Sequence, residues 1–112
     1  MAILVYLNSP EEGSVIHLKD SIIIGQSTEG RLKTKHYQSG LHVPVVLKFD
    51  DSISQRHCIF QLIGESDYRM IDNDSTNGSY LNGQRIEVSV LKHLDFIRIG
   101  KTVFQYRLEE QK

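Results

Sequence analysis

The chain has 112 residues, a formal net charge of −1 and a single cysteine, Cys58. This length suits one domain with its own core, which we expect to span residues 1–112, and the balanced charge argues against a surface that wraps nucleic acid or coats a membrane. A single cysteine cannot form an internal disulfide, which fits a reducing compartment. Cys58 also has no CxxC partner with which to bind zinc.

The apolar start of the chain, residues 1–7, is too short for a signal peptide and lacks a basic flank. No other apolar run approaches the length of a membrane-spanning helix. We therefore expect a soluble, intracellular protein, cytoplasmic or nuclear.

Short apolar segments follow one another along the chain with almost no helical periodicity. They are rich in Ile, Val, Leu, Phe and Tyr, and clusters of Gly, Asn, Asp, Ser and Pro separate them. This pattern predicts an all-β fold, an antiparallel β-sandwich. The expected strands are 2–7, 14–19, 21–24, 45–49, 57–63, 68–72, 79–81, 97–99 and 102–108.

One interval, residues 26–44, interrupts the succession of strands. It is long, polar and basic, and it carries Arg31, Lys33 and Lys35 at alternate positions. A loop of this length inside a compact domain is usually either functional or disordered. In an extended segment alternate side chains share one side, so the three cations would lie together.

The densest group of turn-forming residues is 72–83, which contains two Asn-Gly pairs, beginning at Asn77 and at Asn82. One Asn-Gly pair is enough to reverse a strand, because both residues tolerate positive φ. Ser75 and Thr76 precede the first pair, so one loop offers hydroxyls, a side-chain amide and free backbone N–H groups. Together these groups are typical of a binding site carried on a loop.

Three other motifs stand in order around this loop. Residues 22–25 read Ile-Ile-Ile-Gly, residues 54–57 read Ser-Gln-Arg-His, and residues 91–100 read Leu-Lys-His-Leu-Asp-Phe-Ile-Arg-Ile-Gly. With 72–83 they span most of the chain, and the whole pattern resembles a forkhead-associated (FHA) domain. The resemblance implies a sandwich of about eleven short strands, whose loops at one end bind phosphothreonine in an extended peptide of a protein partner. It also implies a monomer or a module of a larger protein.

The resemblance also implies a role for individual residues. Ser54 would donate its hydroxyl to the phosphate, Thr76 would contact the phosphate through its side chain or backbone, and Asn77 would hold the peptide main chain. The imidazole of His57 would brace the loop that carries Ser54. The scaffold positions are Gly25, His57 and Gly78.

The residues themselves leave simpler alternatives open. A serine before a strand can cap a turn by bonding its own backbone, and a histidine entering an apolar strand is usually a satisfied core residue. Nothing in the sequence supplies an orienting acid or an oxyanion site for Ser54 and His57 to act as nucleophile and base. We therefore expect no enzyme. Since His36, His42, His57 and Cys58 have no recognised ligand spacing, we also expect no metal and no cofactor.

Three positions depart from the pattern of the family. Gln26 stands where the family has an arginine, Gln55 where it often has a basic residue, and Asp74 where it often has glycine. A charge-assisted hydrogen bond contributes about 1.5–3 kcal/mol and a neutral one about 1 kcal/mol, so Gln26 alone could weaken phosphate binding about tenfold. We keep Gln26, Gln55 and Ser75 among the candidate binding residues.

Charge from the 26–44 interval could compensate for these departures. Our hypothesis is that Arg31, Lys33 and Lys35 supply the missing cation, with Arg56 assisting. The alternative is a solvated loop whose charges only aid solubility.

Two functions follow from the sequence. The first is a non-catalytic module that binds a phosphothreonine peptide through its end loops. The alternative is a scaffold with the same fold that binds proteins independently of phosphate, which Gln26 and Asp74 favour.

Overall fold

The structure is a computed structural model that describes residues 1–34 and 42–109. The described chain contains eleven strands and no helix, so it has no helix that could cross a membrane. The strands are β1 (Ala2–Tyr6), β2 (Val15–Leu18), β3 (Ile22–Gly25), β4 (Val43–Val46), β5 (Cys58–Ile63), β6 (Asp67–Asp72), β7 (Ser79–Leu81), β8 (Gln84–Ile86), β9 (Val88–Val90), β10 (Phe96–Ile99) and β11 (Thr102–Leu108).

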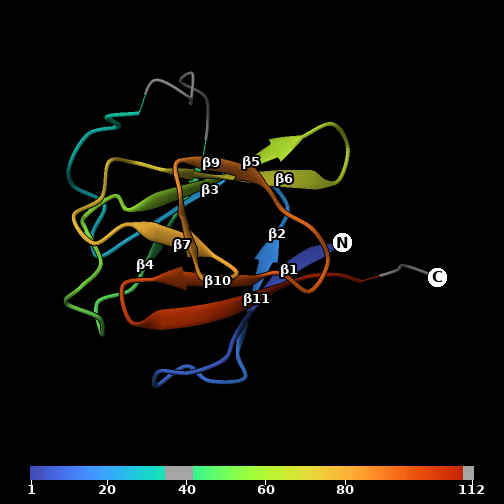
Figure 1. Ribbon diagram of the computed structural model, residues 1–112, viewed down its shortest axis with the longest axis horizontal. Helices are drawn as coiled ribbons and strands as arrows, with labels where there is room; N and C mark the ends of the chain where they lie inside the picture. Colours follow the sequence, from blue (N-terminus) through green and yellow to red (C-terminus); the bar gives the residue numbers. More distant parts are fainter. Residues whose placement is uncertain (35–41, 110–112) are drawn as a thin grey trace.

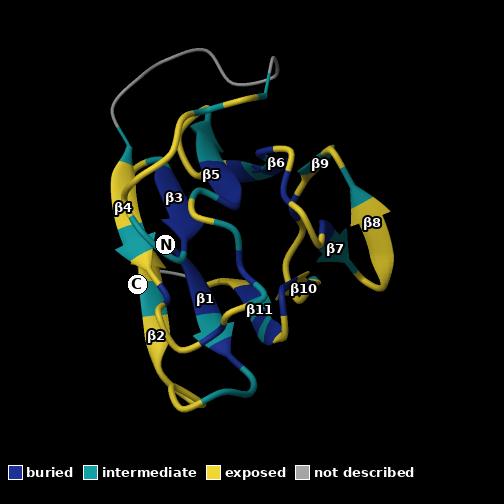
Figure 2. Ribbon diagram, turned by 90° about the vertical axis from the view of Figure 1, so that its left-hand side faces the viewer, coloured by how far each residue is buried: buried dark blue, intermediate teal, exposed yellow. Residues whose placement is uncertain are grey.

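Two sheets lie face to face (Figure 1). One has six strands in the order β2-β1-β11-β10-β7-β8, and the other has five in the order β4-β3-β5-β6-β9. The predicted all-β sandwich is therefore confirmed. In Figure 2 buried residues, in dark blue, lie on central strands such as β1, β3 and β5, and exposed residues, in yellow, on the edge strands β2, β4 and β8.

One pairing differs from the antiparallel arrangement expected throughout. Strands β3 and β4 run parallel, with Ile22 opposite Val43 and Gly25 opposite Val46. A parallel connection must carry the chain back from the end of one strand to the start of the next, which takes about a dozen residues or more. This requirement gives the long 26–44 interval a topological reason, which the sequence pattern did not reveal.

The strand bounds also differ from expectation in three places. Strand β4 begins at Val43 rather than residue 45 and includes Pro44, which an edge strand tolerates because it needs fewer backbone donors. Strands β8 and β9 were not predicted. Each has three residues and lies at the edge of a sheet, and β8 begins with two exposed polar side chains.

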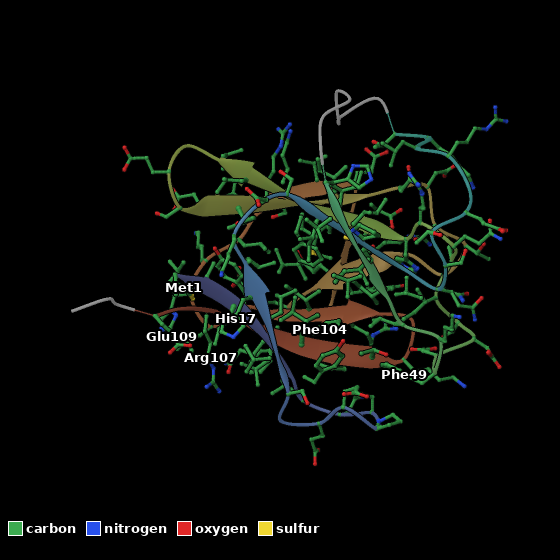
Figure 3. The ribbon with its side chains drawn as sticks, turned by 180° about the vertical axis from the view of Figure 1, so that it is seen from behind. Met1, His17, Phe49, Phe104, Arg107 and Glu109 are labelled. Carbon is green, nitrogen blue, oxygen red and sulfur yellow. The ribbon has the colours of Figure 1, made fainter. Side chains whose placement is uncertain are left out.

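The main core fills the space between the sheets. Alternate residues of β1 point inward, and Phe60, Phe104 and Tyr106 are fully buried; Phe104 lies between the layers in Figure 3. Cys58 is also fully buried in this core, and burial raises the pKa of its thiol. The thiol is therefore a core-filling group.

A second, smaller cluster covers the outer face of the five-stranded sheet. Its buried members are Ile23, Ile59 and Ile71, and Leu32 and Val88 pack against them. Because β3 is covered on both faces, its three consecutive isoleucines need not alternate with polar residues. Leu32 thus attaches the beginning of the 26–44 interval to the sheet.

The turns with the sequence motifs gather at one end of the sandwich. In Figure 1 the cyan 26–34 segment, the green turn before β5 and the gold turn before β7 lie together on the left, away from the marked chain ends. Figure 3 likewise places Phe49 far from Met1 and Glu109, whose backbone carbonyl accepts a hydrogen bond from the N-terminal amine at 2.8 Å. The site is therefore built at the end opposite the termini.

Candidate functional site

A buried histidine joins the two central turns of this end. The side chain of His57 is fully buried; its Nδ1 accepts a hydrogen bond from the Ser54 N–H at 3.0 Å, and its Nε2 bonds the Gly78 carbonyl at 2.8 Å. Since a carbonyl can only accept, Nε2 carries the proton. Burial lowers the pKa of the imidazole, although the Gly78 carbonyl and the carboxylates of Asp72 and Asp50 act in the opposite direction. His57 is thus a neutral brace with both ring nitrogens engaged.

A carboxylate holds the second turn from inside. Asp72 Oδ1 accepts hydrogen bonds from the hydroxyls of Ser75 at 2.5 Å and Ser79 at 2.6 Å, and Oδ2 accepts one from the Ser75 N–H at 3.1 Å. Ser75 is 6% exposed. Its hydroxyl therefore belongs to the support of the turn, although the sequence placed Ser75 among the candidate binding residues.

Direct hydrogen bonds also link the two turns at the surface. The Thr76 N–H donates to Ser54 Oγ at 3.1 Å, and Asn77 Nδ2 donates to the Ser52 carbonyl at 2.8 Å. Thr76 and Asn77 are exposed. The hydroxyl of Ser54, the backbone of Thr76 and the amide of Asn77 consequently lie on one connected surface.

The end of β3 lies directly against the first turn. A Cβ added at Gly25 would stand 1.7 Å from the carbonyl oxygen of Gln55, closer than real Cβ atoms approach. The backbone N–H of Gln26 donates to the Ser54 carbonyl at 3.0 Å, and that of His57 to the Ile24 carbonyl at 2.9 Å. Only glycine fits at position 25, because the backbones meet there.

The described start of the 26–44 interval, residues 26–34, forms a third element of the site, which we call the strap. Arg56 donates from Nε and Nη2 to the Thr28 carbonyl at 3.1 and 2.9 Å. Asn73 Oδ1 accepts from the backbone N–H groups of Lys33 at 2.6 Å and Thr34 at 3.2 Å. The strap is therefore tied to both turns.

Asn73 completes this attachment with its amide nitrogen. Nδ2 donates to the carbonyls of Arg31 at 3.1 Å and Arg56 at 2.7 Å, and the residue is 2% exposed. The sequence prediction missed Asn73, because an asparagine after a strand signals only an ordinary turn.

A cleft of about 230 Å³ lies between the strap and the two turns. Among its described lining residues are three cations, Arg31, Lys33 and Arg56, and no carboxylate. The lining is Gly30, Arg31, Lys33, Ser54, Gln55, Arg56, Asn73 and Thr76. The structure thus brings six of the sequence candidates, Arg31, Lys33, Ser54, Gln55, Arg56 and Thr76, into one place.

Other candidates lie elsewhere. The side-chain amide of Gln26 is directed at the Asp50 carbonyl, 3.5 Å away, and at Asp51 Oδ1, 3.4 Å away, and Gln26 does not line the cleft. Asp74, whose φ is 51°, is exposed and also outside the lining. Lys35 lies outside the described residues.

A larger hollow of about 320 Å³ lies on the other side of the turn before β5, where Phe49, Asp50 and Asp51 contribute to its lining. Asp50 accepts hydrogen bonds from Ser52, from Thr102 and from the Lys101 N–H. Burial opposes ionisation of Asp50, but these bonds outweigh it, and its pKa is lowered. This hollow has two carboxylates and one cation, Lys101, whereas the smaller cleft has three cations and no carboxylate among its described lining residues. The smaller cleft is therefore the candidate anion site.

The described residues contain no group of His, Cys, Asp and Glu side chains arranged to hold a metal ion. The cleft instead offers hydrogen-bond donors: the guanidinium and ammonium groups of its cations, the Ser54 hydroxyl and the Gln55 amide. Such a set suits an anion with several acceptor oxygens.

Solved structures share this fold. The FHA domain of the CT664 protein from Chlamydia trachomatis superposes with a TM-score of 0.75 at 22% identity, covering 97% of this chain and 98% of that one. The MEK1 FHA domain in complex with a HOP1 phosphothreonine peptide superposes with a TM-score of 0.68 at 23% identity, covering 97% of each chain.

Sequence relatives include two bacterial proteins. The glycogen accumulation regulator GarA of Mycobacterium tuberculosis is 29% identical over 101 residues, which are 89% of this chain and 53% of GarA. The oxoglutarate dehydrogenase inhibitor of Corynebacterium jeikeium is 32% identical over 101 residues, 89% of this chain and 60% of the inhibitor. The chain thus spans little more than half the length of these relatives. The FHA domain profile matches residues 22–100, which include β3 to β10 and every described residue of the cleft, so the chain belongs to the FHA domain family.

Proposed function

We propose that the protein is a non-catalytic module that binds phosphothreonine in a protein partner through the cleft at its loop end. The observation that carries the proposal is the lining of this cleft, with three cations and a hydroxyl and no carboxylate among its described residues. A phosphothreonine carries a charge of about −1.5 to −2 at pH 7 and three acceptor oxygens. Clusters of basic residues are the usual recognition device for such groups.

Each group has a role in the proposed complex. Ser54 Oγ already accepts the Thr76 N–H, so its own hydroxyl hydrogen remains to be donated to a phosphate oxygen. Arg31, Lys33 and Arg56 supply the positive charge that Gln26 lacks, and Lys35 would extend this row. Asn77, just outside the cleft, would offer its Oδ1 to the peptide main chain.

The hydrogen bonds of His57 argue against hydrolytic chemistry. A general base for Ser54 would need a free ring nitrogen within reach of Oγ. Nδ1 instead accepts from the Ser54 backbone, and Nε2–H bonds the Gly78 carbonyl. We therefore propose a binding protein and not an enzyme.

A second candidate function, binding of a protein partner without phosphate, is favoured by one observation. Gln26 bonds the turn before β5 instead of facing the cleft, so the end of β3 contributes no cation. The two proposals differ in whether the cleft responds to phosphate.

The test is an amide-resolved NMR titration with paired degenerate peptide pools that differ only in phosphorylation of a central threonine. Shifts at Ser54, Thr76, Arg31 and Lys33 with the phosphorylated pool alone are expected. Ser54→Ala should weaken this binding, whereas Ser66→Ala, an exposed position in the turn between β5 and β6, should not. Equal shifts with both pools would favour the phosphate-independent scaffold.

A further inference from the structure

We infer that Asn73 is the positioning residue of the phosphate cleft: its side chain fixes the strap so that Arg31 and Lys33 face the anion. The inference rests on the proposed function, because a positioned cation matters only if an anion binds. Asn73 itself needs no contact with the ligand. It acts through the backbone of the segment that carries the cations.

The hydrogen bonds of Asn73 converge on both sides of the cleft. Its amide joins the strap at Arg31, Lys33 and Thr34 to the first turn at Arg56, with four bonds of 2.6 to 3.2 Å. An asparagine amide has two N–H donors and an oxygen with two lone pairs, and all four are used here. A carboxylate would lose both donors, and an apolar side chain would lose all four bonds.

The packing of Leu32 fixes which side chains of the strap lie against the sheet and which line the cleft. Leu32 packs on Ile23, Ile59 and Ile71, while Arg31 and Lys33 on either side of it are exposed and line the cleft. In an extended segment neighbouring side chains point to opposite sides. Asn73 bonds the backbone at both Arg31 and Lys33. These bonds keep Leu32 on the sheet side and the two cations on the cleft side.

The cleft depends on the cations of the strap, which Asn73 holds, because Gln26 supplies no charge. The end of β3 presents a neutral amide that bonds the turn at Asp50 and Asp51. Two of the three described cations of the cleft, Arg31 and Lys33, therefore come from the strap. Holding long charged side chains in place before binding reduces the ordering cost at the moment of binding, so the loss of Asn73 should appear as weaker phosphate binding.

The matched control is Asn8. Its side chain also bridges backbone groups, with Nδ2 donating to the Lys101 carbonyl and Oδ1 accepting from the Val103 N–H, both at 2.9 Å. It lies outside the lining of the cleft. Asn8→Ala therefore removes bridging bonds of the same kind without touching the strap.

The first readout is binding of the phosphorylated peptide pool, corrected for the folded fraction of each variant. We expect Asn73→Ala to weaken this binding about tenfold, comparable to the loss of charge-assisted bonds, and to lower its salt dependence. Asn8→Ala should bind as the wild type does. If the wild type binds only the phosphorylated pool and folded Asn73→Ala binds it with unchanged affinity, the role of Asn73 is overturned while the proposed function stands.

A double-mutant cycle separates positioning from a purely structural role. Replacing Arg31 and Lys33 by alanine should weaken binding about tenfold in the wild type but about twofold or less in Asn73→Ala, because the released cations no longer contribute. Independent, additive losses would contradict the inference.

The second readout needs no ligand. Hydrogen exchange of the Lys33 and Thr34 amides, which donate to Asn73, should be slow in the wild type and in Asn8→Ala, and fast in Asn73→Ala. Slow exchange in Asn73→Ala would overturn the inference whatever the peptide binding. A wild type that binds both peptide pools equally would instead refute the proposed function, and with it the role of Asn73 toward phosphate.

Discussion

The two walls of the cleft differ in what holds them. The turn wall, Ser54 to Arg56 with Thr76, is supported by the buried imidazole of His57 and by the close approach of Gly25. The strap wall, Gly30 to Lys33, is attached by Asn73, Leu32 and the guanidinium of Arg56.

The supports of the two walls lie in different parts of the sandwich. The support of the turn wall is continuous with the main core, since His57 precedes β5 and bonds the backbone of β3. The support of the strap wall lies on the outer face of the five-stranded sheet. Changes behind the turn wall should therefore reduce the stability of the fold, whereas changes at the strap wall should reduce phosphate affinity and leave the sandwich folded.

The largest effect should come from His57→Ala. It removes a fully buried ring and leaves the Ser54 N–H and the Gly78 carbonyl without their partner, so we expect unfolding to become easier by about 4 kcal/mol. Urea denaturation measures the change. His93→Ala, at an exposed position, should cost less than about 1 kcal/mol; a similar small cost at His57 would show that the brace is dispensable.

The next largest effect should come from Gly25→Ala. The added Cβ would meet the Gln55 carbonyl oxygen at 1.7 Å, and moving the backbone apart should cost about 3 kcal/mol. Gly13→Ala is the control, because its φ is +87° but nothing lies within 4 Å of the added Cβ. That control should cost about 1 kcal/mol through backbone conformation alone. Equal costs in thermal or urea denaturation would show that the close approach relaxes freely.

The fold could be predicted because burial follows strand alternation in most of the chain. Strand β1 buries Ala2, Leu4 and Tyr6 against the main core, and β11 buries Phe104 and Tyr106. Strands β8 and β9, two short edge strands, were not predicted, and β8 begins with two exposed polar residues. The parallel pairing of β3 with β4 has no local signal.

Part of the candidate site could be predicted from the family motifs and the charge pattern. The motifs single out Ser54 and Thr76, which lie 3.1 Å apart from Oγ to N, and the alternating cations point to Arg31 and Lys33, which line the cleft. Asn73 could not be recognised, because its partners Arg56, Lys33 and Arg31 lie 17, 40 and 42 residues away. The direction of the Gln26 side chain likewise depends on Asp51, 25 residues further on.

A smaller change, in affinity rather than stability, is expected at the end of β3. Gln26→Arg should bind the phosphorylated pool up to about tenfold more tightly, about 1.4 kcal/mol, because a cation replaces a neutral amide. Asp51, which now bonds Gln26, would compete for the new guanidinium. Gln26→Arg with Asp51→Asn should therefore bind more tightly than Gln26→Arg alone. A calorimetric titration checks both variants, and equal gains for the unphosphorylated pool would mean that the added charge acts without regard to phosphate.

The smallest effect should come from pH, and it concerns the turn wall alone. Burial holds the pKa of His57 below its ordinary value of 6.5, so the unfolded chain binds this proton more readily than the folded one. The contribution of the neutral His57 ring to the free energy of unfolding is therefore fully present above about pH 6.5. It falls as the pH is lowered from there through the pKa of the folded state. The lowered pKa of Asp50 adds a second loss that begins near 3.8 and continues downward.

Urea midpoints measured between pH 8 and pH 5 should decrease more in the wild type than in His57→Gln, since glutamine takes up no proton. Chemical shifts of the wild-type imidazole provide an independent check, because the folded ring should titrate at a lower pH than a free histidine. An imidazole that titrates like a free histidine would mean that the ring is not a neutral brace. The imidazole would then place a positive charge behind the turn wall at mildly acidic pH, where the Nδ1 of His57 could no longer accept the Ser54 N–H.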